Sequence, residues 1–553
     1  MQNLIRNILL FILFISISFC SKNKIKVDTL FYNGTIYTVD SAFSICNAFV
    51  IKDGKIVDLG QMEKLMERYS PANKVDLDGK YVYPGFIDAH CHFYNYGIGL
   101  QEASLVGTKS FKEVVDKMVE HSKFSEKKPW ILGRGWDQND WENKKFPNRI
   151  ILDSLFPDKP VFMMRVDGHA ALVNSKALNL AGISYNTKIQ GGDVIIENGE
   201  PSGVLIDNAI ELVRKVIPLP NNEDNLKALL DAERNCFAVG LTTVDDAGLD
   251  KEIIFQIKDL HASGKLKMRI YAMASSTDPN FNYFFKKGKI KTDRLNVRSF
   301  KFYADGALGS RGACLMHDYE DQKGWKGFLL SDENYFREKA KLMLKFGFQM
   351  NTHCIGDSSD RLITDIYFQT LQAQLKEEKI AENFRWRIEH AQVVNDEDLK
   401  KFKYFIPSVQ PTHATSDMYW AADRLGYRIK NAYAYKNLLD VSKVIALGTD
   451  FPVEDISPVK TFYAAVIRKD LNGFPKNGFQ IENSLSREEA LKGITIWAAY
   501  SNFEENEKGS IEIGKFADFV VIDQDLLKVA PEKIIKSKVL YTFINGEKVY
   551  SLK

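Results

Sequence analysis

Two histidines one residue apart, at the end of an apolar run, are the first residues of this sequence that could do chemistry. The segment 83–92 reads YPGFIDAHCH and predicts a short strand that ends in His90 and His92. Side chains alternate between the two faces of a strand, so both imidazoles would point the same way and could bind one divalent metal ion. A pair of surface histidines in a turn is the alternative interpretation of this pattern.

Four more groups that bind metal or transfer protons follow later apolar runs. They are Lys301 within SFKFY, His353 at the end of FQMNTH, His390 at the end of RWRIEH, and Asp450 in GTD after VIAL. Each has a structural alternative: a strand-end histidine can simply bond the backbone, a strand lysine can pair with a carboxylate, and an aspartate after Gly-Thr can cap a helix. Because all four belong to successive predicted strands, we expect them to converge with the histidine pair at one end of a parallel sheet.

The elements that must position these groups alternate between strand-like and helix-like segments from residue 84 to 501. The apolar runs include 241–244, 268–273, 300–303 and 404–408, and amphipathic stretches such as 333–346 and 358–378 lie between them. This alternation predicts a parallel sheet covered by helices, and eight such units would close an α/β fold of the (β/α)8 TIM-like barrel type. The segment exceeds the roughly 250 residues of a plain barrel. We therefore predict a long insertion after the first barrel strand, at about 93–235.

The two ends of the chain are rich in short strands. Asn33-Gly34, Asp53-Gly54 and Asn545-Gly546 lie between apolar runs and predict tight hairpin turns. We predict one small β-sandwich domain built from both termini, with residues 20–83 as its first part and 502–553 as its second.

Composition limits the classes of partner. The 553 residues exceed one ordinary core, and 74 Lys+Arg against 72 Asp+Glu give a net charge of only +2. No long basic run that would favour nucleic-acid binding occurs in the sequence. The cysteines beyond Cys20 are odd in number and lack close pairs, which argues against a disulfide framework.

Residues 1–19 have the pattern of an export signal. Arg6 precedes an apolar stretch that ends at Phe19 and is too short to span a bilayer. Cys20 follows and resembles a bacterial lipoprotein processing site, although Phe19 stands where a small residue is usual. We expect export to the cell envelope and membrane attachment through a lipid on Cys20. Simple secretion, a periplasmic protein and an uncleaved anchor are the alternatives.

The order His-x-His, Lys, His, His, Asp resembles that of the amidohydrolase superfamily of metal-dependent barrel hydrolases. The surrounding motifs are similar to its amidohydrolase-3 branch, the group that includes N-substituted formamide deformylase. The matching segments run through most of the chain. They include residues 84–92, GRGWDQ at 133–138, RVDGH at 165–169, VNSKAL at 173–178, KFYADGALGS at 301–310, IEHAQ at 388–392 and GTDFPV at 448–453.

The resemblance implies a role for each residue of the set. His90 and His92 would bind one metal ion, and His353 and His390 would bind a second if two are present. Lys301 would be carboxylated and bridge the ions, because an ammonium group cannot ligate a metal whereas a carbamate has two anionic oxygens. Asp450 would ligate metal and accept the proton of the attacking water. The expected cofactor is one or two divalent ions, Zn²⁺ ahead of others, together with carboxylated Lys301.

The resemblance further implies hydrolysis of a non-peptide carbon–nitrogen bond, an amide or formamide, in a small-molecule substrate. A divalent ion can lower the pKa of a bound water to about 7, and Asp450 would pass the proton to the departing nitrogen. An ester, lactone or cyclic amide could be hydrolysed with the same site. A surface lipoprotein that binds without catalysis is the third interpretation.

Several further residues are candidates for substrate binding. They are Trp136, Asp137, His169 and Arg311, with His413 and His317 as weaker pocket candidates. His169 is equally compatible with a structural histidine that holds a turn. Arg311 is equally compatible with a structural ion pair. The sequence is compatible with both a monomer and a homo-oligomer.

Overall fold

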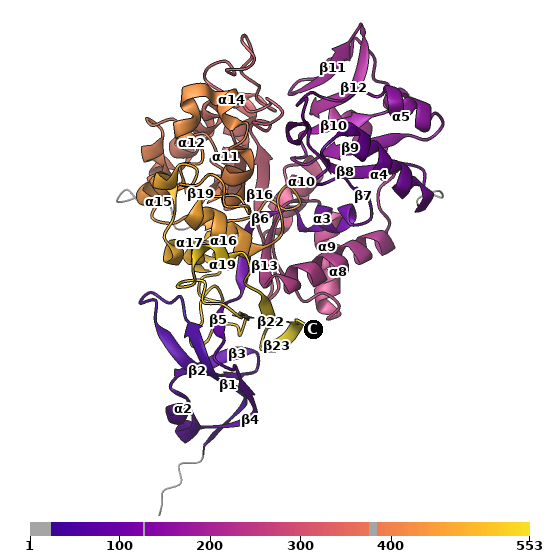
Figure 1. Cartoon of the computed structure of the whole chain (residues 1–553). Coiled ribbons are helices and arrows are strands. Elements are labelled where there is room, and N and C mark those ends of the chain that lie inside the picture. The colour runs from indigo at the N-terminus through magenta and orange to yellow at the C-terminus, as the bar shows by residue number, and fades with distance from the viewer. Residues whose placement is uncertain (1–23, 125–127, 375–383) are drawn as a thin grey trace, which may run out of the picture.

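The computed structural model describes residues 24–124, 128–374 and 384–553, which form three sheets (Figure 1). The predicted signal segment and Cys20 lie outside the described residues. Within the described ranges, none of the helices combines the length and apolar character needed to cross a membrane.

The largest sheet is a barrel of eight parallel strands. Their order is β6 (Phe86–Cys91), β13 (Leu241–Leu249), β14 (Arg269–Ser275), β16 (Leu295–Tyr303), β17 (Gln349–Cys354), β18 (Arg387–His390), β19 (Ile406–Val409) and β20 (Ala446–Leu447). Just beyond the last strand, the Asp450 backbone N–H donates to the His90 carbonyl at 2.7 Å and joins the two ends of the sheet. The predicted (β/α)8 barrel is confirmed.

Helices cover the outside of the barrel. They include α8 (Asn222–Ala238), α9 (Lys251–Ala262), α10 (Asp278–Lys287), α11 (Glu333–Phe346), α12 (Asp357–Leu371), α15 (Tyr435–Ser442), α16 (Pro458–Ile467), α17 (Arg487–Gly493) and α18 (Ile496–Ser501). Helix α11 coincides with the predicted stretch: the Asp332 side chain accepts from the Tyr335 N–H at its start, and left-handed Gly347 ends it. Strand residues such as Phe300, Met350 and Ile388 are wholly buried in the core.

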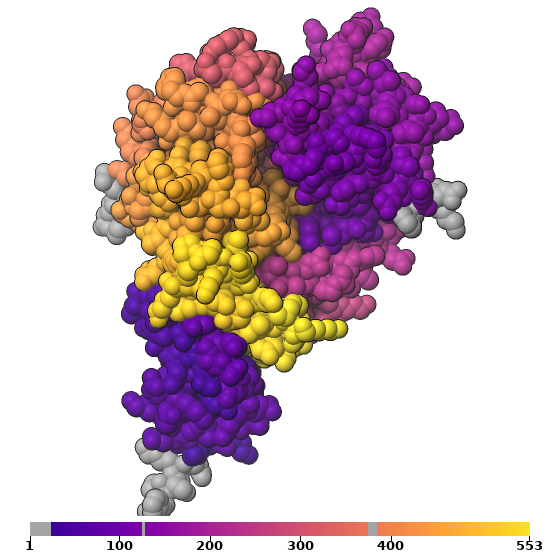
Figure 2. All heavy atoms as spheres, in the orientation of Figure 1, coloured from indigo at the N-terminus to yellow at the C-terminus, as the bar shows by residue number. Residues whose placement is uncertain are grey.

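The insertion after β6 carries a six-stranded sheet of its own. Its order is β11 (Gly192–Glu197), β12 (Glu200–Asp207), β10 (Ala170–Val173), β9 (Val161–Arg165), β8 (Ile131–Trp136) and β7 (Ala103–Ser104). The helices α4 (Phe111–Phe124), α5 (Ile150–Leu155), α6 (Ser175–Leu180) and α7 (Ile210–Arg214) accompany it. In the space-filling view this sheet forms a purple lobe beside the barrel (Figure 2). Helix α3 (Phe93–Gly99) connects β6 to the lobe.

Strands from both termini form the third sheet. Its order is β23 (Glu547–Ser551), β22 (Val539–Ile544), β21 (Phe519–Ile522), β5 (Tyr81–Pro84), β1 (Ile25–Tyr37), β2 (Ile45–Lys52) and β3 (Lys55–Gly60), with β4 (Tyr69–Asp76) beside β1. The two ends therefore meet in one continuous hydrogen-bonded sheet. Neighbouring residues of β1, Leu30 and Phe31, belong to different apolar clusters, so both faces of this sheet are packed.

Two of the three predicted hairpin turns are present. Asp53-Gly54 joins β2 to β3 and Asn545-Gly546 joins β22 to β23, and all four residues have positive φ, as a type I′ turn requires.

The hairpin predicted at Asn33-Gly34 is wrong. Strand β1 continues through it with an irregular register between Tyr32 and Ile36. The Asn33 amide donates to Asp76 Oδ1 at 2.7 Å, and a Cβ on Gly34 would lie 2.7 Å from Leu77 Cδ1. The dipeptide thus forms a bulge against the neighbouring chain, where a side chain on Gly34 would require Leu77 to shift.

Candidate metal centre

The predicted ligands converge at the carboxyl ends of the barrel strands. His90 Nε2 lies 2.9 Å from Lys301 Nζ, and His92 Nε2 lies 3.2 Å from Asp450 Oδ1. The ring centroids of His353 and His390 are 4.5 Å apart, and those of His90 and His390 are 4.8 Å apart. All of these residues except His90 line a cavity of about 260 Å³.

Three of these side chains have the geometry of a metal site. His90, His390 and Asp450 are buried, and each offers a ligand atom within 4.8 Å of the others. Within the described chain, Asp450 Oδ1 is buried without a hydrogen bond of good geometry. A buried carboxylate oxygen surrounded by neutral imidazoles is costly unless a cation neutralises it. The donor set of imidazoles and a carboxylate therefore fits a divalent ion.

The protonation states suit metal binding. Burial lowers the pKa of His90 to about 4 and holds those of His353 and His390 well below the ordinary value. Neutral imidazoles have a free lone pair for a metal. Burial alone would raise the pKa of Asp450, but the nearby histidines, His92 foremost, outweigh it and hold that pKa well below its usual range.

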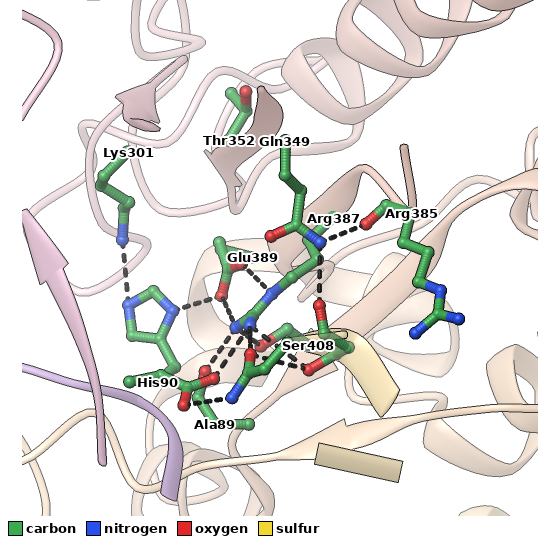
Figure 3. A network of polar contacts seen from close by, with 12 residues as sticks. Ala89, His90, Lys301, Gln349, Thr352, Arg385, Arg387, Glu389 and Ser408 are labelled. Carbon is green, nitrogen blue, oxygen red and sulfur yellow. Dashed lines mark hydrogen bonds and ion pairs between the residues drawn. The ribbon is translucent and has the colours of Figure 1, made fainter. Parts of the chain in front are cut away.

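A buried carboxylate orients the first ligand. His90 Nδ1 contacts Glu389 Oε2 at very short range, and the Arg387 Nε donates to Glu389 Oε1 at 2.6 Å (Figure 3). Arg387 also donates to Asp245 Oδ2 at 3.0 Å and to Ser408 Oγ at 2.8 Å. With Nδ1–H directed at a carboxylate, His90 Nε2 carries the lone pair that a metal would bind, and it now faces Lys301 Nζ at 2.9 Å. Burial opposes ionisation of Glu389, but Arg387 and His90 lower its pKa to about 2.

The backbone turns sharply at two ligands. His390 and Asp450 have φ values of 71° and 62°, in the left-handed region that side chains rarely adopt. In a regular strand Glu389 and His390 would face opposite sides. The left-handed turn at His390 lets both approach the same centre. Gln410 Oε1 lies 2.8 Å from His390 Nδ1 and leaves its Nε2 free.

Asp450 is positioned by the contact between the first and last strands. Asp88 Oδ1 accepts from the N–H groups of Thr449 at 3.0 Å and His90 at 3.1 Å. A Cβ on Gly448 would lie 2.5 Å from the His90 nitrogen, so only glycine permits this approach. The Gly-Thr-Asp motif therefore joins the two strands as well as supplying a carboxylate.

Residues 74–550 match the model of the amidohydrolase family. The chain belongs to this family. Protein LONG AFTER FAR-RED 3 of Arabidopsis thaliana is 32% identical over 548 residues, which cover 95% of this chain and 92% of that protein. N-substituted formamide deformylase of Arthrobacter pascens is 25% identical, and the matched region covers 94% of this chain and 97% of that protein. The crystal structure of an uncharacterized metal-dependent hydrolase from Pyrococcus horikoshii superposes with a TM-score of 0.74 and 28% sequence identity. The matched region covers 91% of this chain and 99% of that chain.

The amidohydrolase is thus a metal-dependent hydrolase with a small-molecule substrate. Two of the predicted substrate-binding residues line its cavity. Asp137 accepts from Arg165 Nη2 at 2.5 Å. His169 Nδ1 lies 2.6 Å from Asp207 Oδ1, and its ring is 5.2 Å from that of His353. Both come from the insertion, which therefore forms one wall of the amidohydrolase cavity.

The other two lie elsewhere. Trp136 is 1% exposed in the core of the insertion, where its Nε1 donates to the Met163 carbonyl at 2.9 Å. Alternation along β8 turns it away from the cavity that Asp137 lines. Arg311 Nη2 bonds Asp321 Oδ2 at 2.8 Å, and the residue is absent from the cavity lining. Neither supplies the pocket contact predicted for it.

Sequence reasoning underrated one histidine and missed the carboxylate network. His413, on α13 (Pro411–Asp417), lines the amidohydrolase cavity with its Nε2 3.8 Å from Asp450 Oδ2, whereas His317 is exposed. One feature of the sequence could have indicated Arg387 and Glu389. They are two residues apart in β18 and so lie on the same face of the strand, and an oppositely charged pair on one face of a buried strand indicates a buried polar network.

Proposed function

We propose that this amidohydrolase hydrolyses the carbon–nitrogen bond of an amide or formamide. The observation that carries the proposal is the position of Asp450: its Oδ1 lies 3.2 Å from His92 Nε2 and 3.7 Å from His90 Nε2, and its Oδ2 faces the cavity near His413. A carboxylate among the ligand histidines can accept a proton from water and deliver it to a leaving group. An amine leaves poorly unless it is protonated, so an amide substrate uses this shuttle most fully.

The residues that would hold the metal are the full predicted set. They are His90, His92, Lys301, His353, His390 and Asp450. When bound, a divalent ion, for which we propose Zn²⁺, would acidify a water molecule and polarise the scissile carbonyl.

Lys301 would serve as a carbamate. Burial lowers the pKa of its amine to about 8, against the opposing charges of Glu389 and Asp450. At pH 7 roughly a tenth of such amines are neutral, and only the neutral amine reacts with carbon dioxide. Its Nζ lies 2.9 Å from His90 Nε2, so a carboxyl group added there would be close to the ligand histidines.

The reaction balances with water as the only co-substrate. Asp450 would accept one proton of the water as its oxygen bonds the carbonyl carbon. The same carboxyl group would then transfer that proton to nitrogen as the carbon–nitrogen bond breaks. The products are a carboxylic acid, formate in the case of a formamide, and an amine. The similarity to N-substituted formamide deformylase supports the formamide subclass.

The test is a substrate panel on metal-reconstituted protein. Chelated protein is loaded with Zn²⁺ and assayed against N-substituted formamides, N-acyl amines and the matched esters and lactones. We expect turnover of a formamide or amide that is lost on chelation and restored by metal. Preferential turnover of the esters or lactones, by tenfold or more, would instead assign the site to carbon–oxygen bonds.

We also propose that residues 1–19 direct export and that Cys20 carries the lipid that attaches the protein to the cell envelope. The apolar stretch before Cys20 supports this proposal. Labelling of cells with a palmitate analogue should mark the protein, and Cys20→Ser should remove the label. Unlabelled mature protein released into the medium would favour simple secretion.

A further inference from the structure

A second cavity adjoins the first and opens toward the insertion. It has a volume of about 610 Å³, against about 260 Å³ for the first. His92, His169 and Tyr303 line both cavities. The predicted metal ligand His92 therefore lies at the junction of the two spaces, and the larger space can accommodate a second part of the substrate.

Arg134 lines this larger cavity and is incompletely bonded. It is half-buried on β8, and one of its amino groups, Nη2, donates to the Val166 carbonyl at 3.3 Å. Its Nε is buried without a hydrogen-bond partner, and Glu102, the carboxylate that acts on it most strongly, forms no ion pair with it among the described residues. A guanidinium stays charged at any physiological pH, so partial burial without a carboxylate in direct contact is costly.

The other charged groups of the larger cavity are already bonded. The contacts are Asp167 with Arg165, Asp207 with His169 at 2.6 Å, Glu211 with Arg214 at 3.0 Å, and Asp250 with the Asn280 amide at 3.3 Å. Arg134 is therefore the cavity-lining charge, among the described residues, that a ligand could pair with most favourably.

We propose that the substrate carries a carboxylate that binds Arg134 in the larger cavity. The inference deepens the proposed function and rests on it: the scissile amide would lie at the junction of the two cavities, with the carboxylate directed toward the insertion. A guanidinium binds a planar carboxylate through two parallel N–H groups. A phosphate is the weaker candidate, because a dianion would face one guanidinium without an ion pair, with Asp167 and Asp207 close by.

The test separates binding from turnover. Zn²⁺-loaded Asp450→Asn protein is titrated calorimetrically with N-formyl-β-alanine and with N-ethylformamide, which differ only in the carboxylate. The same pair is then measured in Asp450→Asn combined with Arg134→Gln, with Arg134→Lys, or with the control Arg214→Gln. Arg214 lines the same cavity but is engaged by Glu211. Wild-type protein is assayed for hydrolysis of both compounds.

We expect the carboxylate compound to bind about tenfold or more tightly than its neutral partner. Arg134→Gln should abolish this ratio, Arg134→Lys should retain part of it, and Arg214→Gln should leave it within about twofold.

Equal affinities for the two compounds would overturn the inference. A carboxylate preference that survives Arg134→Gln would do so as well, since the carboxylate would then bind elsewhere, for instance at the metal. Arg134-dependent binding without any hydrolysis by wild-type protein would keep the carboxylate site and reject the proposed reaction. Hydrolysis of both compounds with equal KM would keep the proposed reaction and reject the carboxylate site.

Discussion

The barrel and the insertion both present charged side chains to one cavity, but they hold them in different ways. The barrel groups lie at strand ends and are backed by a fully buried network in which Arg387, Glu389 and His90 have no exposed side-chain surface. Two of the insertion groups are less deeply buried than this network: the His169 side chain is 16% accessible and Arg134 is half-buried. Buried, multiply bonded groups keep one geometry, whereas partly exposed groups can adapt to a ligand.

This difference separates the chemistry from the choice of substrate. The barrel network would fix the positions of the groups that act on the bond, and the insertion would select the molecule that carries it. Substitutions in the barrel should therefore change kcat and metal content. Substitutions in the insertion should change KM with little effect on either.

Asp450→Asn should have the largest effect. The amide cannot accept a proton, so we expect kcat to fall by about 10³-fold or more while most metal stays bound through the histidines. Steady-state kinetics and metal analysis of the same preparation check both parts. Turnover near that of the wild type would remove Asp450 from the role of base.

Lys301→Ala should reduce metal occupancy to well below half, because the proposed bridging carbamate is lost. Acetate or propionate at high concentration should restore part of the metal and part of the activity. Lys291→Ala is the control, since Lys291 pairs with Glu504 and Glu507 away from the cavity. Full metal content and rate in Lys301→Ala would contradict the bridging role.

Glu389→Gln should weaken metal affinity by about 10- to 100-fold, because the group that orients His90 would lose its charge. Competition with a chromophoric chelator measures this affinity. The substitution preserves side-chain size, so an unchanged affinity would mean that the geometry of His90 is set by packing alone.

His169→Gln should have the smallest effect: KM should rise about fivefold, while kcat and metal content stay within about twofold, since one substrate hydrogen bond is lost. Trp136→Phe is the control within the same insertion. It removes the bond to the Met163 carbonyl and should lower thermal stability without changing KM. Metal loss in His169→Gln would place this histidine in the metal centre and break the division between the two regions.

The sequence predicted the barrel and the convergence of its ligands because both follow from strand alternation. His90 with His92 and His353 at the end of its run lie where that periodicity puts them. The arrangement of Glu389 and His390 could not be predicted, since it depends on the left-handed backbone at His390. Trp136 failed for a related reason: the pattern identifies two faces of a strand but does not say which one meets the cavity.

The terminal sheet has a consequence for the order of synthesis. Every predicted metal ligand has been synthesised by residue 450, yet β5, directly before the ligand strand β6, pairs with β21 at residues 519–522. Arg269 at the start of β14 bonds Asp518, and Tyr37 bonds Asp525. These pairings span most of the chain, and contacts so distant in sequence form late and slowly. The sheet that precedes the first barrel strand is therefore completed only after the last hundred or so residues of the chain have been synthesised. A chain released early would carry every ligand but would lack β21, one of the two strands that flank β5.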